Sequence, residues 1–115
     1  MLSGPGKRPA VLVVEAPELQ RLYRVILEGH GYEVISADVQ AGLDLLSRRP
    51  RPVHLLITNS PEPFVPYTPE LRILYVSGSL PEGAVYRGAD GAVRTLAKPF
   101  SNRVLLESVQ ELLGG

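Results

Sequence analysis

Short apolar runs that alternate with helix-like segments constrain the fold of this chain more than any other feature of its sequence. The clearest run is AVLVVE at residues 10–15, whose continuous β-branched and apolar side chains are typical of a strand buried on both faces. Further strands are predicted in YEVISA, VHLLIT, LRILYVS and AVRTLA, at residues 32–37, 53–58, 71–77 and 92–97. Strands of this kind, alternating with helices, predict a parallel sheet that is covered on both sides.

The segments before the second and third strands and after the last strand have the spacing and end signals of helices. The first helix is predicted to begin at Pro17 and to end at Gly29 or Gly31, and its inward face carries Leu19, Leu22, Tyr23 and Ile26. The second follows Asp38, which can cap it, and places on one face Val39, Leu43 and Leu46. The last follows Ser101 and turns inward Leu105, Val109 and Leu112.

The order of these elements predicts a flavodoxin-like, doubly wound α/β fold with five parallel strands in the order 2-1-3-4-5. The chain has 115 residues, enough for one domain with a single core. We expect a flexible tail over residues 1–9 and one domain over residues 10–113. Ligands of such folds bind at the carboxyl ends of the strands, near the point where the strand order reverses. The residues at these ends are Glu15, Thr58, Ser77 and Lys98.

Composition excludes several classes of function. Twelve basic residues balance twelve acidic ones, so no net charge attracts the chain to nucleic acid or to an anionic membrane. The chain has no cysteine, which excludes disulfides, thiolate catalysis and cysteine-based zinc sites. No apolar run approaches the ~20 residues that span a bilayer, and the first residues lack the apolar segment of a signal peptide. These features predict a cytoplasmic protein.

Several motifs carry a resemblance to a known family. They are VLVVE at the first strand, LEGHGYEVISA at the entry into the second, ILYVSG at the fourth and LAKPF at the fifth. Through them, residues 10–113 resemble the receiver domains of bacterial two-component response regulators, the CheY-like domains. The resemblance implies a pocket in which an acidic pair holds Mg²⁺ and an aspartate accepts a phosphoryl group. It also implies that Ser77 and Lys98 contact the phosphate, and that partners include a histidine kinase or an output domain.

The sequence departs from the receiver pattern at the residues that carry its chemistry. Glu15 stands at the second position of the acidic pair and Val14 at the first, while an alignment shifted by one residue leaves Ala16 at the second position. Thr58 stands at the phosphoacceptor position, and a shift by one residue brings Asn59 there. A threonine hydroxyl is a poor nucleophile without a neighbouring base, and one carboxylate is a thin ligand set for Mg²⁺. We therefore expect no phosphorylation at this position, no metal site and no cofactor.

A proline-rich segment occupies the place of the third helix of a typical receiver. In NSPEPFVPYTPE, residues 59–70, prolines at 61, 63, 66 and 69 each lack a backbone donor and disfavour the α conformation in the residue before them. We predict an extended, polyproline-like crossover here. Phe64 and Val65 are expected to pack over the sheet, with a docking surface for partners as the alternative. A short helix is predicted at about Pro81 to Arg87.

The strand-end residues also have simple structural interpretations. Lys98 is expected to reach Glu15 and form an ion pair, which we favour over a live phosphate sensor. The hydroxyls of Ser77 and Thr58 are expected to satisfy backbone groups where their strands end.

We therefore predict a degenerate receiver domain, a non-enzymatic module of two-component signalling that binds other signalling proteins without being phosphorylated. Homodimerisation is possible through the sheet edge beside the last helix. One alternative is a working receiver with a non-standard acidic site that uses Glu15 or Glu62. Another is a small flavodoxin-like domain that binds a nucleotide or a flavin, although EAPEL after the first strand offers no glycine-rich loop.

Overall fold

All five predicted strands form, and they pair in one parallel sheet with the predicted order β2-β1-β3-β4-β5. The computed structural model describes residues 9–48, 53–68, 70–77, 92–98 and 100–114. Each strand lies within its predicted range, and four of them (β2 to β5) begin one or two residues later than predicted. Their bounds are Ala10–Val14 (β1), Glu33–Ala37 (β2), Leu55–Thr58 (β3), Arg72–Ser77 (β4) and Val93–Ala97 (β5).

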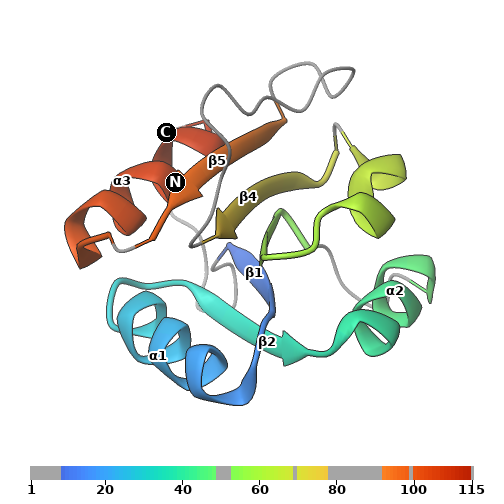
Figure 1. Ribbon diagram of the computed structural model, residues 1–115, viewed down its shortest axis with the longest axis horizontal. Coiled ribbons are helices and arrows are strands. Elements are labelled where there is room, and N and C mark those ends of the chain that lie inside the picture. Colours follow the sequence, from blue (N-terminus) through green and yellow to red (C-terminus); the bar gives the residue numbers. More distant parts are fainter. Residues whose placement is uncertain (1–8, 49–52, 69, 78–91, 99, 115) are drawn as a thin grey trace, which may run out of the picture.

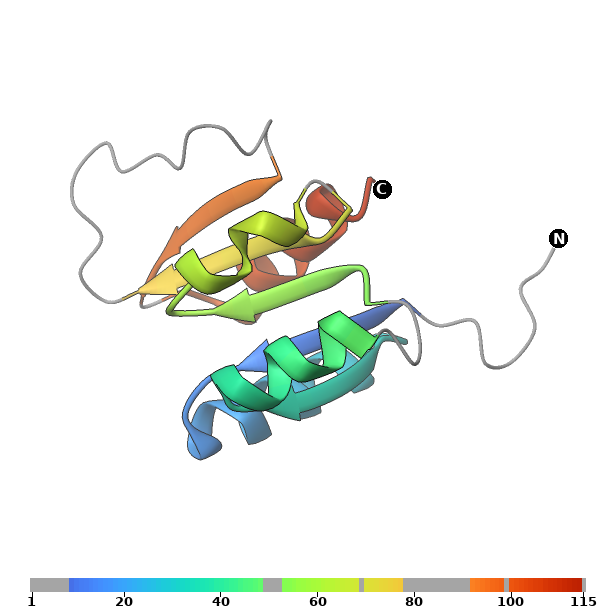
Figure 2. The ribbon, with the colours of Figure 1, turned by 90° about the vertical axis from the view of Figure 1, so that its right-hand side faces the viewer.

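Helices cover both faces of the sheet. The α-helices are Pro17–Glu28 (α1), Val39–Arg48 (α2) and Asn102–Leu112 (α3), and a 3₁₀ helix spans Glu62–Tyr67 (η1). Figures 1 and 2 show α1 and α3 together on one face, with α2 and η1 on the other. α1, α2 and η1 lie in connections between parallel strands, and each such connection must cross one face of the sheet.

The central strand β1 is buried on both faces, as its unbroken apolar run predicts. Val11 and Val13 pack in the core beneath α1 and α3, whereas Leu12 and Val14 pack in the core beneath α2 and η1. Successive side chains of a strand point to opposite faces, so one five-residue strand contributes to both cores. Glu15, which directly follows β1, therefore lies at the end of a fully buried strand.

The predicted N-caps of α2 and α3 are confirmed, as is a glycine turn after α1. The Oγ atom of Ser101 accepts a hydrogen bond from the Val104 amide at 3.1 Å, and the Asp38 Oδ1 accepts one from the Ala41 amide at 2.8 Å. Gly31, just beyond α1, has a φ of 92°, a conformation that glycine adopts without strain. These local signals fix where α2 and α3 begin and where the chain turns towards β2.

The prediction of an extended conformation for the proline-rich segment is wrong. Residues 62–67 form the 3₁₀ helix η1, whose hydrogen bonds include one from the Phe64 amide to the Pro61 carbonyl at 2.9 Å. The fixed φ of proline near −65° suits a 3₁₀ turn as well as an extended chain, and a short helix needs few backbone donors. The Phe64 side chain is fully buried against the sheet, so the prediction that it packs there is confirmed, whereas Val65 is only half-buried.

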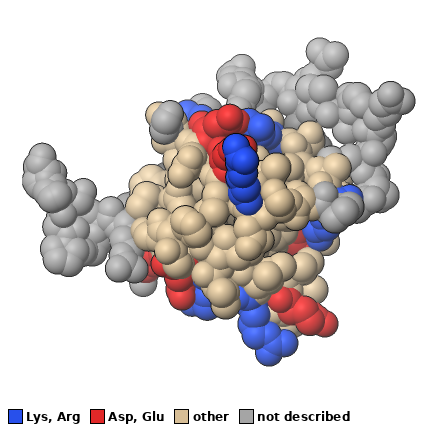
Figure 3. All heavy atoms as spheres, turned by 90° about the vertical axis from the view of Figure 1, so that its left-hand side faces the viewer, with Lys and Arg blue, Asp and Glu red and all other residues tan. Residues whose placement is uncertain are grey.

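The predicted inward faces of α1 and α2 need a correction. Leu22 is 50% exposed and Val39 is 36% exposed, while Leu27, which the prediction left out, is fully buried. The buried residues of α1 are Tyr23, Ile26 and Leu27. The inward face of the helix is therefore centred on these three residues, and Leu22 lies at its exposed margin. Figure 3 shows a broad uncharged area over the face that α1 and α3 form.

Two further predictions lie outside the described residues. They are the short helix at about Pro81 to Arg87 and the flexible tail over residues 1–9, of which only Pro9 is described. Among the helices that are described, none is long and apolar enough to cross a membrane.

Candidate functional site

The four strand-end residues singled out in the sequence lie at one edge of the sheet. Thr58 and Ser77 are the last residues of β3 and β4, while Glu15 and Lys98 directly follow β1 and β5. Val14 is paired with Thr58, and Ser77 is paired with Ala97. Because all the strands are parallel, their carboxyl ends meet along this edge, and chain segments far apart in sequence contribute to one site.

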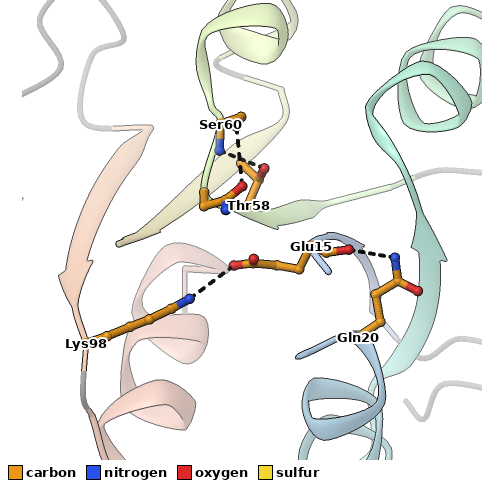
Figure 4. A network of polar contacts seen from close by, with 6 residues as sticks. Glu15, Gln20, Thr58, Ser60 and Lys98 are labelled. Atoms are coloured by element: carbon orange, nitrogen blue, oxygen red, sulfur yellow. Dashed lines mark hydrogen bonds and ion pairs between the residues drawn. The ribbon is translucent and has the colours of Figure 1, made fainter. Parts of the chain in front are cut away.

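Glu15 and Lys98 form an ion pair across this edge. The Lys98 Nζ lies 3.9 Å from the Glu15 Oε2, as the sequence predicted (Figure 4). The side chain of Glu15 has no exposed surface, whereas that of Lys98 is 28% exposed. The carboxylate is thus held inside the protein, and the lysine reaches it from the surface.

Burial leaves the Glu15 carboxylate poorly solvated. Within the described part of the chain, neither of its oxygens has a hydrogen bond of good geometry, and the Ala16 amide stabilises the charge only weakly. Burial raises the pKa of Glu15 above its ordinary value of 4.5, and the smaller opposing effects come from the Lys98 charge and the backbone amide of Ala16. The lysine therefore compensates only part of the cost of placing a carboxylate here.

Tyr23 of α1 has a hydroxyl that the charge of Glu15 affects. Its hydroxyl is buried and has no hydrogen-bond partner among the described residues. Burial and, secondarily, the charge of Glu15 raise the pKa of the Tyr23 hydroxyl well above its usual range. The ring of Tyr23 stacks on that of Phe100, with centroids 6.5 Å apart and planes inclined by 13°. Tyr23 thus links the region of Glu15 to the start of α3.

Gln20 is a residue of the site that the sequence analysis did not single out. Its Nε2 donates one hydrogen bond to the Glu15 carbonyl at 2.8 Å (Figure 4). It donates another to the Ala37 carbonyl at 3.3 Å. The amide therefore ties the end of β1 to the end of β2 and fixes the backbone from which the Glu15 side chain projects. A glutamine in the first turns of a helix gives no sequence signal for this role, because both acceptors belong to other elements.

The Thr58 hydroxyl is engaged in a hydrogen bond with a nearby backbone amide. Its side chain is fully buried, and its Oγ1 accepts a hydrogen bond from the Ser60 amide at 3.0 Å. This turn leads the chain from β3 towards η1, and it matches the prediction that the Thr58 hydroxyl satisfies a backbone group. At the neighbouring strand end, the Ser77 carbonyl accepts a hydrogen bond from the Lys98 amide at 2.9 Å, which fixes the backbone of the lysine.

Solved structures of similar shape identify the fold. A response regulator receiver protein from Burkholderia phymatum matches with a TM-score of 0.77 and 19% identity, over 93% of this chain and 96% of that one. A response regulator from Thermotoga maritima matches with a TM-score of 0.76 and 20% identity, over 94% and 99% of the two chains. The chain has the CheY-like receiver fold.

A third similar structure is a sensor protein from Polaromonas sp. JS666, with a TM-score of 0.74 and 26% identity over 93% of this chain and 97% of that one. No protein-family model matches the chain, and no curated protein matches it. The chain thus shares the receiver fold with structures whose sequences are only 19–26% identical to it, and the chemistry of the pocket must be judged from the residues in it.

The described residues of the receiver pocket do not fit Mg²⁺. They offer one carboxylate, Glu15, which faces Lys98, while Val14 is an apolar core residue and the Thr58 oxygen already accepts a hydrogen bond. In the described part of the chain, no three acidic, histidine or cysteine side chains come together as a metal site would require. Glu62, the other acid considered, lies exposed at the first position of η1. Mg²⁺ favours carboxylate and phosphate oxygens, and a neighbouring ammonium opposes its binding.

Proposed function

We propose that this chain is a cytoplasmic receiver module of two-component signalling that binds other signalling proteins without being phosphorylated and without catalytic activity of its own. The observation that carries the proposal is the state of Thr58. At the position where the resemblance to receivers implies an acceptor aspartate, the structure has a buried hydroxyl that accepts a hydrogen bond from the Ser60 amide.

The chemistry of the pocket supports this proposal. Phosphoryl transfer to a hydroxyl needs a base to take the proton, and it needs cations to neutralise the phosphoryl oxygens. The carboxylate of the site, Glu15, is engaged by Lys98 at 3.9 Å. In this pair the Glu15 carboxylate neutralises the charge of Lys98, so the lysine needs no phosphate as its counterion. A receiver built in this way keeps one arrangement of its pocket, whatever the supply of phosphodonor.

Partners of such a module would be a histidine kinase, an output domain or another signalling protein, and a second copy of the chain is also possible. The exposed apolar side chains of α1, Leu22 and Val25, lie on a surface of the kind that protein partners contact; they are 50% and 73% exposed. The balanced charge of the chain supports recognition by proteins in preference to nucleic acid.

Intact-mass measurement after incubation with Mg²⁺ and a small phosphodonor such as acetyl phosphate tests the proposal. We expect an unchanged mass for this chain, while a receiver with an acceptor aspartate, treated in parallel, gains a phosphoryl group. A phosphoryl group on this chain would refute the proposal. Beryllofluoride with Mg²⁺ gives an independent test, because a raised melting temperature would favour the alternative of a working receiver with a non-standard site.

A further inference from the structure

The carboxylate of Glu15 is placed where a single proton would affect two interactions of the same junction. One is its ion pair with Lys98, which directly follows β5. The other is the effect of its charge on the hydroxyl of Tyr23, whose ring stacks on Phe100 just before α3. Lys98 and Phe100 are here called the β5–α3 junction.

We propose that Glu15 is a proton-operated lock on the β5–α3 junction: the ionised carboxylate holds Lys98 at the pocket, and protonation releases the lysine to solvent. The proposal adds an input to the function proposed above and rests on it only for biological meaning. Its physical basis is the buried Glu15 side chain, which has the Lys98 ammonium at 3.9 Å and a weaker stabilising effect from the Ala16 amide.

The surroundings of Glu15 make the lock sensitive to that proton. Among the described residues, the charged or titratable groups whose electrostatics are coupled to the carboxylate are Lys98 after β5 and Tyr23 of α1. β3 and β4 end in the uncharged residues Thr58 and Ser77. Burial makes protonation of Glu15 easier than in water, so the transition belongs above the ordinary carboxyl pKa of 4.5.

Lys98 can move into solvent directly, because its side chain is already 28% exposed. When Glu15 is neutral, the lysine loses its partner, and full solvation of its ammonium becomes the more stable arrangement. The Tyr23 hydroxyl is then no longer affected by a negative charge on Glu15. Both changes meet at the β5–α3 junction, so the effect of the proton is expected at Lys98 and Phe100 and not throughout the sheet.

Nuclear magnetic resonance of the full chain across a pH series tests the proposal without any phosphodonor. We expect the Glu15 carboxyl resonance, the Lys98 side chain and the amides of Lys98 and Phe100 to share one transition with a midpoint above pH 4.5. In Glu15→Gln this transition should disappear. In the matched control Glu18→Gln, which removes an exposed carboxylate from the first turn of α1, it should remain.

Other outcomes would overturn the lock. They are a Glu15 midpoint at or below 4.5, a Lys98 side chain that does not follow the Glu15 carboxyl, and a junction transition that persists in Glu15→Gln. The carboxyl and lysine titrations of the unsubstituted chain decide the matter even if Glu15→Gln does not fold. A phosphorylated chain would refute the function proposed above and would leave this test unaffected, since the series contains no phosphodonor.

Discussion

At the end of β3 the buried hydroxyl of Thr58 accepts a hydrogen bond from the Ser60 amide at 3.0 Å, whereas after β1 the buried carboxylate of Glu15 depends on Lys98 at 3.9 Å. We call these two regions the acceptor end, which comprises the Thr58–Ser60 turn and η1, and the charged end, which comprises Glu15 and Lys98. The acceptor end begins at the end of β3, which lies between the two strands of the charged end, because Glu15 follows β1 and Lys98 follows β5 in the order β2-β1-β3-β4-β5. The acceptor end is neutral and locally satisfied, while the charged end is strongly polar and depends on a contact distant in sequence.

Under the function proposed above, the difference explains how a receiver fold can keep its pocket without being phosphorylated. A neutral side chain at the acceptor end needs only a neighbouring backbone amide, so it imposes no charge requirement on the rest of the pocket. A lysine at the charged end still requires an anion, because partial burial of its ammonium costs free energy unless a negative charge lies beside it. Glu15 supplies that anion from within the protein.

The largest effect is expected from breaking the packing of the acceptor end. Phe64→Ala removes a fully buried ring that lies near Gly42 of α2 and holds η1 against the sheet. We expect a loss of about 3–5 kcal/mol in the free energy of unfolding, measured by urea denaturation. Val25→Ala, at a site that is 73% exposed, is the control and should change stability by no more than about 0.5 kcal/mol. A small effect of Phe64→Ala would show that η1 contributes little to the core.

The next largest effect is expected at the charged end. Lys98→Met leaves the Glu15 carboxylate buried without its cation, which should cost about 3 kcal/mol at neutral pH and less at acid pH, where Glu15 becomes neutral. Arg103→Met breaks the exposed pair of Arg103 with Glu107 and serves as the control, with an expected cost below about 0.5 kcal/mol. Urea denaturation of both variants at two pH values measures the difference. Equal costs for the two variants would contradict a special role for the buried pair.

Removing one hydrogen bond should weaken the acceptor end moderately. Thr58→Val keeps the size of the side chain but leaves the Ser60 amide without its acceptor, and we expect a loss of about 1 kcal/mol in the free energy of unfolding. Thr58→Ser keeps an acceptor oxygen and is the matched control for the hydrogen bond. Amide hydrogen exchange at Ser60 should become faster in Thr58→Val but not in Thr58→Ser. Unchanged exchange in Thr58→Val would show that the hydrogen bond to Thr58 does not stabilise this turn.

The smallest effect, opposite in sign, is expected from neutralising the charged end. Burial raises the folded-state pKa of Glu15 above 4.5, so protonation stabilises the folded chain, and the contribution of Glu15 to stability falls as pH rises through the window above 4.5. Glu15→Gln should therefore remove this fall and raise the free energy of unfolding at neutral pH by up to about 1 kcal/mol. Thermal unfolding across a pH series checks both effects. A less stable variant at neutral pH would mean that the attraction to Lys98 outweighs the cost of burial.

The sequence predicted the strands, the α-helices that cover them and the caps at Asp38 and Ser101, because these features depend on residues close together in the chain. It also predicted that Lys98 reaches Glu15, because the fold class brings the ends of β1 and β5 to one edge. The conformation of the proline-rich segment was predicted wrongly. Proline fixes its own φ but does not choose between an extended chain and a 3₁₀ turn, and the burial of Phe64 favoured the turn.

By itself, then, the sequence determined the receiver fold and the identities of the residues at its strand ends, since apolar periodicity and end signals act over short distances. Only the tertiary structure decided how those residues are satisfied. The complete burial of the Glu15 side chain, the bridge from Gln20 to two strand ends and the contact of Tyr23 with Phe100 each join elements that are separate in the chain. Solvation and charge depend on what surrounds a group in space, and those surroundings exist only when the sheet and its helices have assembled.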